Sequence, residues 1–398
     1  MNKNVELLAP AGDLERLRAA IYFGADAIYL GGPMLQLRAD IAGFSMEQLA
    51  EAVQTAHAAG KKIYVAVNSL VRNGEVELLP DYARALRDIG ADAVIVTDLG
   101  AIVTINKAAP ELDIHVSTQA SCLNYAAATQ YFELGAKRVV LGREMTLDEI
   151  ADFRAKTPKE LEIESFIHGA MCMAYSGRCI LSAYLNGRSA NRGDCSQPCR
   201  YRYELKLADR EGEFFPVFEN DEGSMIMSSR DLNTMPFIEK LIEAGVTSLK
   251  IEGRMKSTYY VSTVVNAYRR RLDGTAPLEL CERELNCASH REFTSGFYFG
   301  EVKYAPSAGA EYKQDCVFTA IVRGEENGRY IIEQRNNFRA GDTLEILSPN
   351  SMGESFTVED MRTLEGEAVD YAPHPQQLLT IPCDFKLSPG DILRRRVK

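Results

Sequence analysis

The chain has 398 residues, a formal net charge of −11 at pH 7 and nine cysteines. This length exceeds what a single small core needs and predicts two domains, one of them large. The negative charge argues against nucleic-acid binding over the whole surface, although it leaves room for a local basic patch. The amino-terminal sequence MNKNVELLAPAG lacks the pattern of a secretion signal, and no apolar run has membrane-spanning length. We therefore expect a cytoplasmic protein with no membrane partner, in which thiols stay reduced.

The first 275 residues repeat one unit, in which a helical segment ends at a glycine and an apolar strand follows directly. The glycines are Gly24, Gly60, Gly90, Gly135 and Gly245. Glycine favours the left-handed conformation that closes many helices, and a continuous Val/Ile/Leu run is typical of a strand buried on both faces. Two helix starts are marked as well, because Ser45 with Gln48, and Thr146 with Glu149, match the capping-box pattern.

Eight apolar segments alternate with these helices and are expected to form strands. They begin at Val5, Ala27, Lys62, Ala93, Asp113, Arg138, Leu161 and Ser248. The alternation predicts an α/β fold, a (β/α)₈ TIM-type barrel over residues 1–275. An open doubly wound sheet is the alternative. That fold normally brings several glycines after the first strand for phosphate binding, and LAPAGDLE contains only one.

The pattern changes after residue 275. Residues 276–310 are expected to form a linker, which includes an apolar and aromatic stretch from Phe293 to Phe299. From residue 311 to 398 the chain consists of short alternating segments separated by turn signals. Many short strands in so few residues predict a small C-terminal β-barrel domain.

Polar side chains follow most of the expected barrel strands. Because the chemistry of such barrels gathers at the carboxyl ends of the strands, we expect one site there. The catalytic candidates are Glu164, His168 and Glu252, and the substrate-binding candidates are Asn68, Gln119, Arg143, Glu144 and Arg254.

Four cysteines lie close together in a long insertion, residues 171–228, between the seventh and eighth strands; we call this segment the cysteine insertion. They are Cys172, Cys179, Cys195 and Cys199, and five arginines between His168 and Arg202 accompany a single acid, Asp194. Four thiols are a natural ligand set for a soft metal or an iron–sulfur cluster. Structural zinc sites usually have two tight pairs, and only the second pair is tight here. The spacing therefore favours a cluster over zinc, and it leaves open cysteines that bind nothing.

The remaining cysteines are Cys122, Cys281, Cys287, Cys316 and Cys383. They are scattered among apolar neighbours, so we expect buried structural thiols. The odd total and the absence of a secretion signal argue against a disulfide framework.

The stretch from Glu164 to Cys172, ESFIHGAMC, is followed after four residues by GRCILS from Gly177 to Ser182. This pattern resembles the signature of peptidase family U32, the collagenase-like peptidases of unassigned catalytic type. The LAPAG opening, the barrel and the C-terminal β-domain resemble that family over nearly the whole chain. The resemblance implies that Cys172, Cys179, Cys195 and Cys199 hold a [4Fe–4S] cluster. It also implies RNA hydroxylation with the help of prephenate, a small dicarboxylate.

Three functions stay open at this point. The first is hydroxylation of a tRNA or rRNA pyrimidine by a cluster-dependent enzyme, with RNA and a small dicarboxylate as partners and room for a paralogous partner chain. The second is a peptidase, as the family label states. The chain has no H-E-x-x-H or G-x-S-x-G motif, although a Cys172–His168 or Ser182–His115 pair is conceivable. The third is a non-catalytic assembly or maturation partner with a structural cluster.

Overall fold

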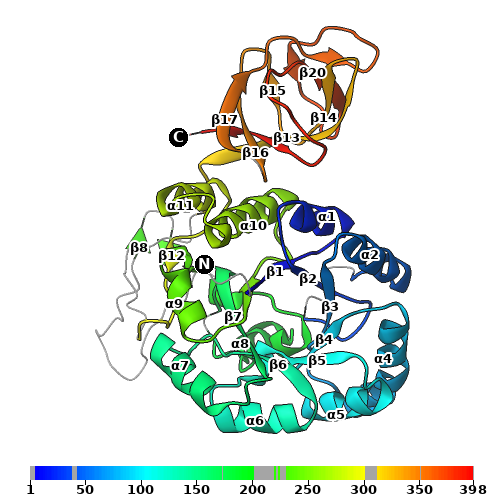
Figure 1. The fold of residues 1–398 in the computed structure, drawn as a ribbon, viewed down its shortest axis with the longest axis vertical. Coiled ribbons are helices and arrows are strands. Elements are labelled where there is room, and N and C mark those ends of the chain that lie inside the picture. The colour runs from blue at the N-terminus through cyan, green and yellow to red at the C-terminus, as the bar shows by residue number, and fades with distance from the viewer. Residues whose placement is uncertain are drawn as a thin grey trace.

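The computed structural model describes residues 5–37, 43–172, 174–200, 219–220, 223–224, 230–300, 312–349 and 351–397. A closed barrel of parallel strands forms the larger domain (Figure 1). Its strands are β1 (Glu6–Pro10), β2 (Ala27–Gly31), β3 (Lys62–Val67), β4 (Ala93–Val96), β5 (Asp113–Val116), β6 (Ala136–Val140), β7 (Glu162–Ala170) and β11 (Ser248–Ile251). Each strand pairs with the next, and β11 closes the ring by pairing with both β7 and β1. The TIM-type prediction is confirmed.

A ring of helices covers the outside of the barrel (Figure 1). They are α1 (Leu14–Tyr22), α2 (Met46–Ala58), α3 (Asn73–Val76), α4 (Leu79–Asp88), α5 (Leu99–Ala108), α6 (Tyr125–Glu133), α7 (Leu147–Lys156), α9 (Ile238–Glu243) and α10 (Thr258–Asp273). One large apolar cluster fills the space between strands and helices. Both expected capping boxes are present, and all five helix-closing glycines have positive φ. Among the described helices, none has both the length and the apolar character that a membrane crossing requires.

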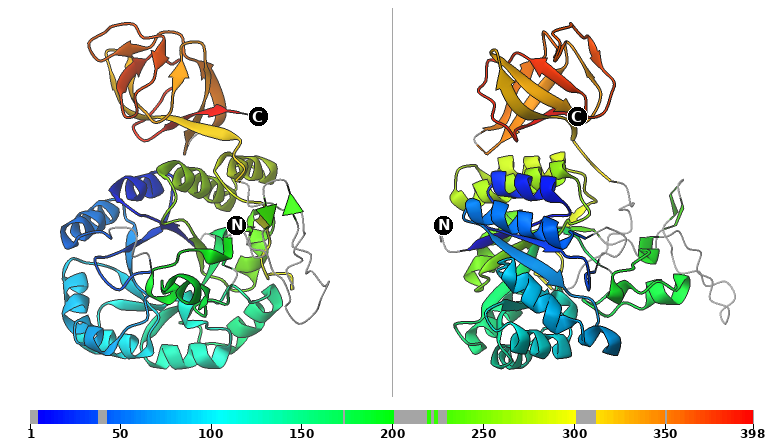
Figure 2. Two further views of the ribbon diagram at one scale, coloured as in Figure 1. Left: turned by 180° about the vertical axis from the view of Figure 1, so that it is seen from behind. Right: turned by 90° about the vertical axis from the view of Figure 1, so that its right-hand side faces the viewer.

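The cysteine insertion leaves β7 and projects from one end of the barrel (Figure 2). Its described part contains α8 (Leu181–Asn186) and the 3₁₀ turns Ala190–Arg192 and Pro198–Arg200. Two short strands, β8 (Glu219–Asn220) and β9 (Gly223–Ser224), pair with each other. Residues 201–218, YRYELKLADREGEFFPVF, alternate as a β-hairpin would, but they lie outside the described residues. Further 3₁₀ turns span Thr118–Ala120 and Met235–Phe237.

The sheet continues past β7 in a way that the sequence did not predict. Strand β10 (Asp231–Asn233) pairs antiparallel with the last residues of β7, and β12 (Phe293–Thr294) pairs parallel with β10. Two- and three-residue strands carry too little pattern to be recognised in a sequence, because their pairing depends on tertiary contacts.

The prediction of a linker at residues 276–310 is wrong for much of its length. Helix α11 (Leu278–Cys287) packs against α10, and it buries Cys281, Leu285 and Cys287. Leu278, Cys281 and Leu285 recur at helical spacing, so one face of this segment is apolar and packs against the barrel.

The C-terminal domain is antiparallel β and has an apolar core of its own. Its strands are β13 (Cys316–Glu326), β14 (Arg329–Gln334), β15 (Phe338–Arg339), β16 (Thr343–Ser348), β17 (Ser351–Thr357), β18 (Arg362–Thr363), β19 (Tyr371–Ala372), β20 (Leu378–Ile381) and β21 (Ile392–Arg396). Seven of them form one sheet in the order β17-β16-β21-β13-β14-β20-β18, and β15 pairs with β19. The domain lies beside the barrel, against α10 and α11 (Figure 2).

The two domains meet in a well-packed interface. The buried guanidinium of Arg394 forms two hydrogen bonds of 2.7 Å with the carboxylate of Glu284 in α11. The rings of Tyr259 and Phe318 stack with their centroids 5.4 Å apart. Charged groups that are fully buried must be paired to be tolerated, so this contact fixes how the domains fit together.

Candidate functional site

A pocket opens at the carboxyl-terminal end of the barrel and encloses about 520 Å³ of empty space, part of it open to solvent; we call it the barrel pocket. Five of the predicted site residues line it: Asn68, Gln119, Arg143, Glu252 and Arg254. The rest of its wall consists of Tyr29, Leu37, Ala66, Ile95, Ser117, Thr118, Phe166 and Lys250. Residues within or just after β2, β3, β4, β5, β6, β7 and β11 therefore converge, as expected for strand ends in this fold.

Three basic side chains of the barrel pocket lie against aromatic rings. The guanidinium carbon of Arg143 is 3.8 Å from the centroid of the Phe166 ring. The ammonium of Lys250 and the guanidinium of Arg254 are 4.4 Å and 6.0 Å from the centroid of the Tyr29 ring. Such cation–π contacts hold the cations without neutralising them.

One acid of the pocket wall faces these cations. A carboxylate oxygen of Glu252 lies 3.9 Å from a guanidinium nitrogen of Arg143, and the Tyr29 hydroxyl lies 3.4 Å from the same oxygen. Arg143 also donates to the Ala170 carbonyl over 2.8 Å, and Arg254 donates to the Gln36 amide oxygen over 3.0 Å. The wall therefore has more positive than negative charge, and the side chains that carry it are held in place.

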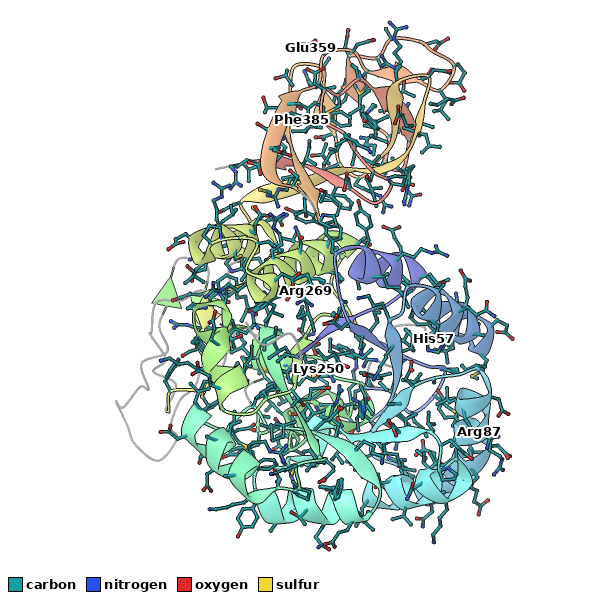
Figure 3. The ribbon with its side chains drawn as sticks, in the orientation of Figure 1. His57, Arg87, Lys250, Arg269, Glu359 and Phe385 are labelled. Atoms are coloured by element: carbon teal, nitrogen blue, oxygen red, sulfur yellow. The ribbon has the colours of Figure 1, made fainter. Side chains whose placement is uncertain are left out.

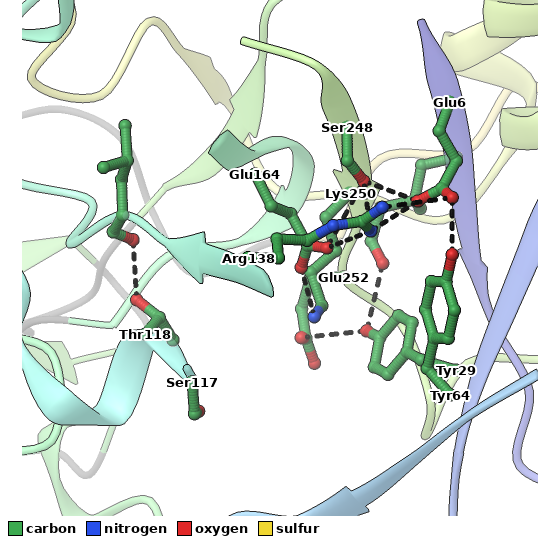
Figure 4. A network of polar contacts seen from close by, with 12 residues as sticks. Glu6, Tyr29, Tyr64, Ser117, Thr118, Arg138, Glu164, Ser248, Lys250 and Glu252 are labelled. Atoms are coloured by element: carbon green, nitrogen blue, oxygen red, sulfur yellow. Dashed lines mark hydrogen bonds and ion pairs between the residues drawn. The ribbon is translucent and has the colours of Figure 1, made fainter. Parts of the chain in front are cut away.

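The floor of the barrel pocket is an ion-pair network inside the barrel (Figure 4). The buried Glu164 accepts from the Lys250 ammonium over 2.7 Å and from Arg138 over 3.0 Å. Arg138 also binds Glu6 over 2.6 Å. Figure 3 shows Lys250 in the middle of the barrel, whereas His57 and Arg87 lie on its outside. Glu164 therefore lies below the pocket, as the counter-ion of Lys250, and its catalytic role stays a prediction.

Burial changes the ionisation of this network. Removal from water lowers the pKa of Lys250, and the nearby Glu164 carboxylate opposes that change. Burial tends to raise the pKa of Glu6, but the charge and the hydrogen bonds of Arg138 outweigh it, so the pKa lies below the usual value.

His168 lies outside the barrel pocket, contrary to prediction. Its ring is buried among Tyr260, Tyr268 and Phe293, whose centroids lie 5.5–6.1 Å away. Burial lowers the pKa of His168 to about 3. The imidazole is thus neutral and packed behind β7, with its Nδ1 3.4 Å from the Tyr268 hydroxyl. This position suits a structural side chain rather than one that touches a substrate in the pocket.

The cysteine insertion is tied to the pocket wall at its first turn. A carboxylate oxygen of Glu144 accepts from the backbone N–H of Ser176 over 2.8 Å and from its hydroxyl over 3.2 Å. Gly177, with φ of +73°, lies so close to Gln119 that a Cβ would be 2.0 Å from the Gln119 carbonyl oxygen. Glu144 therefore does not line the pocket as predicted. Its role is to hold the insertion beside it.

A second attachment involves Asn191 and Arg192, farther along the insertion. Arg192 donates to the Leu70 carbonyl over 2.5 Å and pairs with Glu75 over 2.8 Å. The Arg192 side chain and its charge lower the pKa of Glu75 to about 2. The backbone N–H of Leu70 donates to the Asn191 carbonyl over 3.2 Å. The two attachments fix the described part of the insertion at the pocket end of the barrel.

The four predicted ligand cysteines lie in this insertion. Cys172 and Cys195 are exposed, and Cys179 and Cys199 are partly exposed. Ser182 Oγ accepts from the backbone N–H of Ser196 over 3.0 Å, which ties the segment after Cys179 to the one after Cys195. Four accessible thiols fit a soft metal or cluster by their chemistry. In the described part of the chain, however, no three Cys, His, Asp or Glu side chains are arranged to hold a metal ion. The ligand set stays a prediction.

The other cysteines lie away from this insertion. Cys122, Cys281, Cys287 and Cys316 are buried, as expected, and Cys383 is partly buried. Cys287 and Cys316 face each other across the domain interface, with 2.9 Å between their sulfurs.

The sequence analysis missed Lys250 and Phe166 as pocket residues. A signal for both was present, because side chains two residues apart on a strand share one face. Lys250 is two residues before Glu252, and Phe166 is two residues after Glu164. Both residues lie within their strands. The side chains expected to line the site were those at or just beyond the strand ends, so neither residue was predicted.

Known proteins resemble this chain over both domains. The family model for peptidase family U32 matches residues 12–306, and the model for the peptidase family U32 C-terminal domain matches residues 314–394. A protein of Bacillus subtilis named tRNA hydroxylation protein P1 is 38% identical over 99% of this chain and 96% of its own length. A 23S rRNA 5-hydroxycytidine synthase of Escherichia coli is 40% identical over 68% of this chain and 39% of its own. A protein of Porphyromonas gingivalis named collagenase is 32% identical over 99% of each chain. This chain belongs to peptidase family U32.

Proposed function

We propose that this chain is an RNA hydroxylase, which places a hydroxyl group on a pyrimidine base of tRNA or rRNA. The full-length similarity to a protein named for tRNA hydroxylation carries the proposal. The similarity to an rRNA hydroxycytidine synthase covers 68% of this chain and adds support for a base as the target.

The barrel pocket suits a single flipped base. The amides of Asn68 and Gln119 each offer a donor and an acceptor, as the edge of a pyrimidine requires. A base in a nucleic acid must leave its stack before an enzyme can act on its ring, and a pocket at the end of a barrel can receive it.

The basic wall suits a small anion beside the base. We propose that a small dicarboxylate such as prephenate is a co-substrate of the hydroxylation. Arg143 and Arg254 can each bind a carboxylate through two parallel hydrogen bonds, which a lysine could not reproduce.

The thiols of Cys172, Cys179, Cys195 and Cys199 would hold a [4Fe–4S] cluster, with zinc as the alternative. A bound cluster would supply one-electron transfer next to the pocket. The chain's own contribution is to hold the insertion rigidly over the pocket through Glu144. The expectation of a paralogous partner chain also stays a prediction.

A peptidase is the second candidate, because one relative is named collagenase. Ser182 is buried, and its hydroxyl is 3.0 Å from that of Ser196. His115 lies inside the barrel against Tyr64, where burial, helped by the charge of Arg138, lowers its pKa well below the usual value. In the regions that the structure describes, no hydrogen bond joins Ser182 to His115 or Cys172 to His168. Neither conceivable nucleophile–histidine pair is therefore assembled.

One preparation can separate these functions. Protein purified without oxygen would be incubated with RNA from a strain that lacks its gene, with and without prephenate. We expect a pyrimidine nucleoside heavier by one oxygen atom, measured by mass spectrometry. We also expect bound iron that is lost in Cys172→Ala and retained in the control Cys383→Ala. Cleavage of casein or denatured collagen that persists after iron removal, with no heavier nucleoside, would favour the peptidase. Bound iron with neither activity would favour a non-catalytic assembly partner.

A further inference from the structure

Large apolar side chains are unusually exposed on the cysteine insertion. Tyr184 is 81% exposed, Ile180 is 75% exposed and Tyr175 is 60% exposed. The backbone N–H of Tyr184 donates to the Ile180 carbonyl over 2.9 Å, so these two residues lie one helical turn apart on the same face. Exposed aromatic side chains that gather in one place mark an interaction surface more often than scattered ones do.

A cationic side chain, Arg178, lies between Tyr175 and Ile180 in the sequence. Arg178 is exposed, and the one contact found for its guanidinium within the described residues is a neutral one, 3.4 Å from the Ser121 hydroxyl. Its charge is therefore available to a partner. The whole chain has a net charge of −11, so a negatively charged partner needs local cations such as Arg178 in order to bind.

This face lies at the edge of the barrel pocket. Tyr175 and Arg178 flank Ser176 and Gly177, the two residues that contact the pocket wall. The backbone N–H of Arg178 donates to the Tyr175 carbonyl over 3.0 Å, which closes a turn around the two contact residues. The turn therefore lies at the edge of the pocket, where the neighbours of a polymer residue bound in the pocket can reach it.

We propose that Tyr175, Arg178, Ile180 and Tyr184 form a stacking surface for the unpaired nucleotides next to the base that enters the barrel pocket. The inference rests on the proposed RNA substrate and deepens it. Once a base leaves the stack, its neighbours lose a stacking partner, and tyrosine rings can replace it regardless of base identity. Arg178 binds the phosphate between them. A protein partner is the less favoured occupant, because a protein seated on this turn would block the approach of a polymer to the pocket.

Binding of a labelled tRNA to the holo-protein tests the proposal. Loss of one stacking ring costs roughly five- to a hundredfold in affinity. We expect such a loss in Tyr175→Ala and in Tyr184→Ala, and recovery in Tyr175→Phe and Tyr184→Phe, which keep the ring. Tyr371→Ala is the matched control, since Tyr371 is 40% exposed with Arg339 over its ring, but lies in the C-terminal domain. Arg178→Gln should also lower the slope of log affinity against log salt by about 0.7.

The outcomes are distinguishable. Unchanged tRNA affinity in the double variant Tyr175→Ala/Tyr184→Ala, with hydroxylation by the wild-type protein intact, would overturn the stacking surface and leave the proposed function standing. Wild-type protein that neither binds nor hydroxylates RNA would overturn both. A change of oligomeric mass with unchanged tRNA affinity would assign the face to a protein contact instead. Photocrosslinking of thiouridine-labelled tRNA to the wild-type protein should label the peptide that contains Tyr175 or Tyr184, and labelling only elsewhere would contradict the proposal without any variant.

Discussion

Replacing Glu164 by Gln separates a structural role of this carboxylate from a catalytic one. The side chain is fully buried and lies 2.7 Å from the Lys250 ammonium and 3.0 Å from the Arg138 guanidinium. Glu164→Gln keeps the shape and one acceptor but removes the charge. Arg138 retains Glu6 and Glu162, whereas Lys250 loses the carboxylate that it touches. The substitution therefore leaves a poorly compensated cation in the barrel interior.

The magnitude follows from these distances. A pair at 2.7 Å is worth about 6 kcal/mol at an effective dielectric constant of about 20. Gln avoids the cost of burying a carboxylate, so part of this lost interaction energy is recovered. Removal of one partner of a buried pair usually costs about 3–5 kcal/mol of folding stability. With one acceptor retained, we expect about 3 kcal/mol, which lowers the melting temperature of a domain of this size by about 6–12 °C.

Calorimetry and the hydroxylation assay should be run on the same samples. Glu162→Gln is the matched control, because Glu162 pairs with the same Arg138 but is 48% exposed. An exposed pair contributes little, so its melting temperature should change by no more than about 2–4 °C. If Glu164→Gln melted like the wild-type protein but had lost hydroxylation, Glu164 would be acting on the substrate, and the structural interpretation would be refuted.

Three further predictions follow from single positions. Gly177→Ala should reduce iron content and hydroxylation, because its Cβ would collide with the pocket wall. Gly187→Ala is the control, since Gly187 has a similar φ of +68° but no atom within 4 Å of an added Cβ, and it should cost only about 1–2 kcal/mol of local strain. Glu284→Gln leaves the buried Arg394 with a weaker partner and should lower stability by about 3 kcal/mol, seen as earlier melting in calorimetry; unchanged melting would contradict this. The folded-state pKa of His168, about 3, lies below the ordinary 6.5, so stability is full above pH 6.5 and falls as pH decreases toward 3. The fall should reach at most about 1.4 kcal/mol per pH unit, and urea midpoints of His168→Phe should fall less steeply.

The barrel could be predicted from the sequence because its signals are local and repeated. A glycine such as Gly90 closes a helix, and the apolar run from Ala93 then forms a strand, with the two events only a few residues apart. Repetition of the unit leaves little choice of topology, since parallel strands joined by helices close in one direction. The same reasoning does not extend to α11. This helix begins after Pro277 and follows a turn signal at Gly274. The sequence therefore predicted a linker there, although the apolar residues of the segment have helical spacing.

From the sequence, the site could be predicted only as a set of side chains at the strand ends, without the direction in which each one points. Arg143 and Arg254 follow their strands and line the pocket, as expected. Glu164 does not, because β7 runs from Glu162 to Ala170 and so places Glu164 near the start of the strand, below the pocket. The prediction for His168 is wrong for a different reason. The register between β7 and β11 shifts at Lys250/Ile251, and tyrosines from α10 cover the histidine. A shift of one residue changes the face of every later side chain, and no local pattern marks it.

The two attachments of the cysteine insertion bear on how a cluster and a substrate could depend on each other. Neither attachment uses a cysteine: one is the Glu144–Ser176 contact and the other is the Arg192–Glu75 pair. The backbone around the thiols is therefore held by the barrel itself, and the proposed stacking surface is held with it. A cysteine substitution should then remove iron without detaching the insertion, whereas Glu144→Gln should loosen the insertion while leaving all four thiols in the chain. Comparison of tRNA affinity in the two variants would show which of them positions the RNA. Retained affinity in Cys172→Ala together with weakened affinity in Glu144→Gln would assign positioning to the barrel contacts. The reverse result would mean that the metal centre, and not the attachment, orders the RNA-binding face.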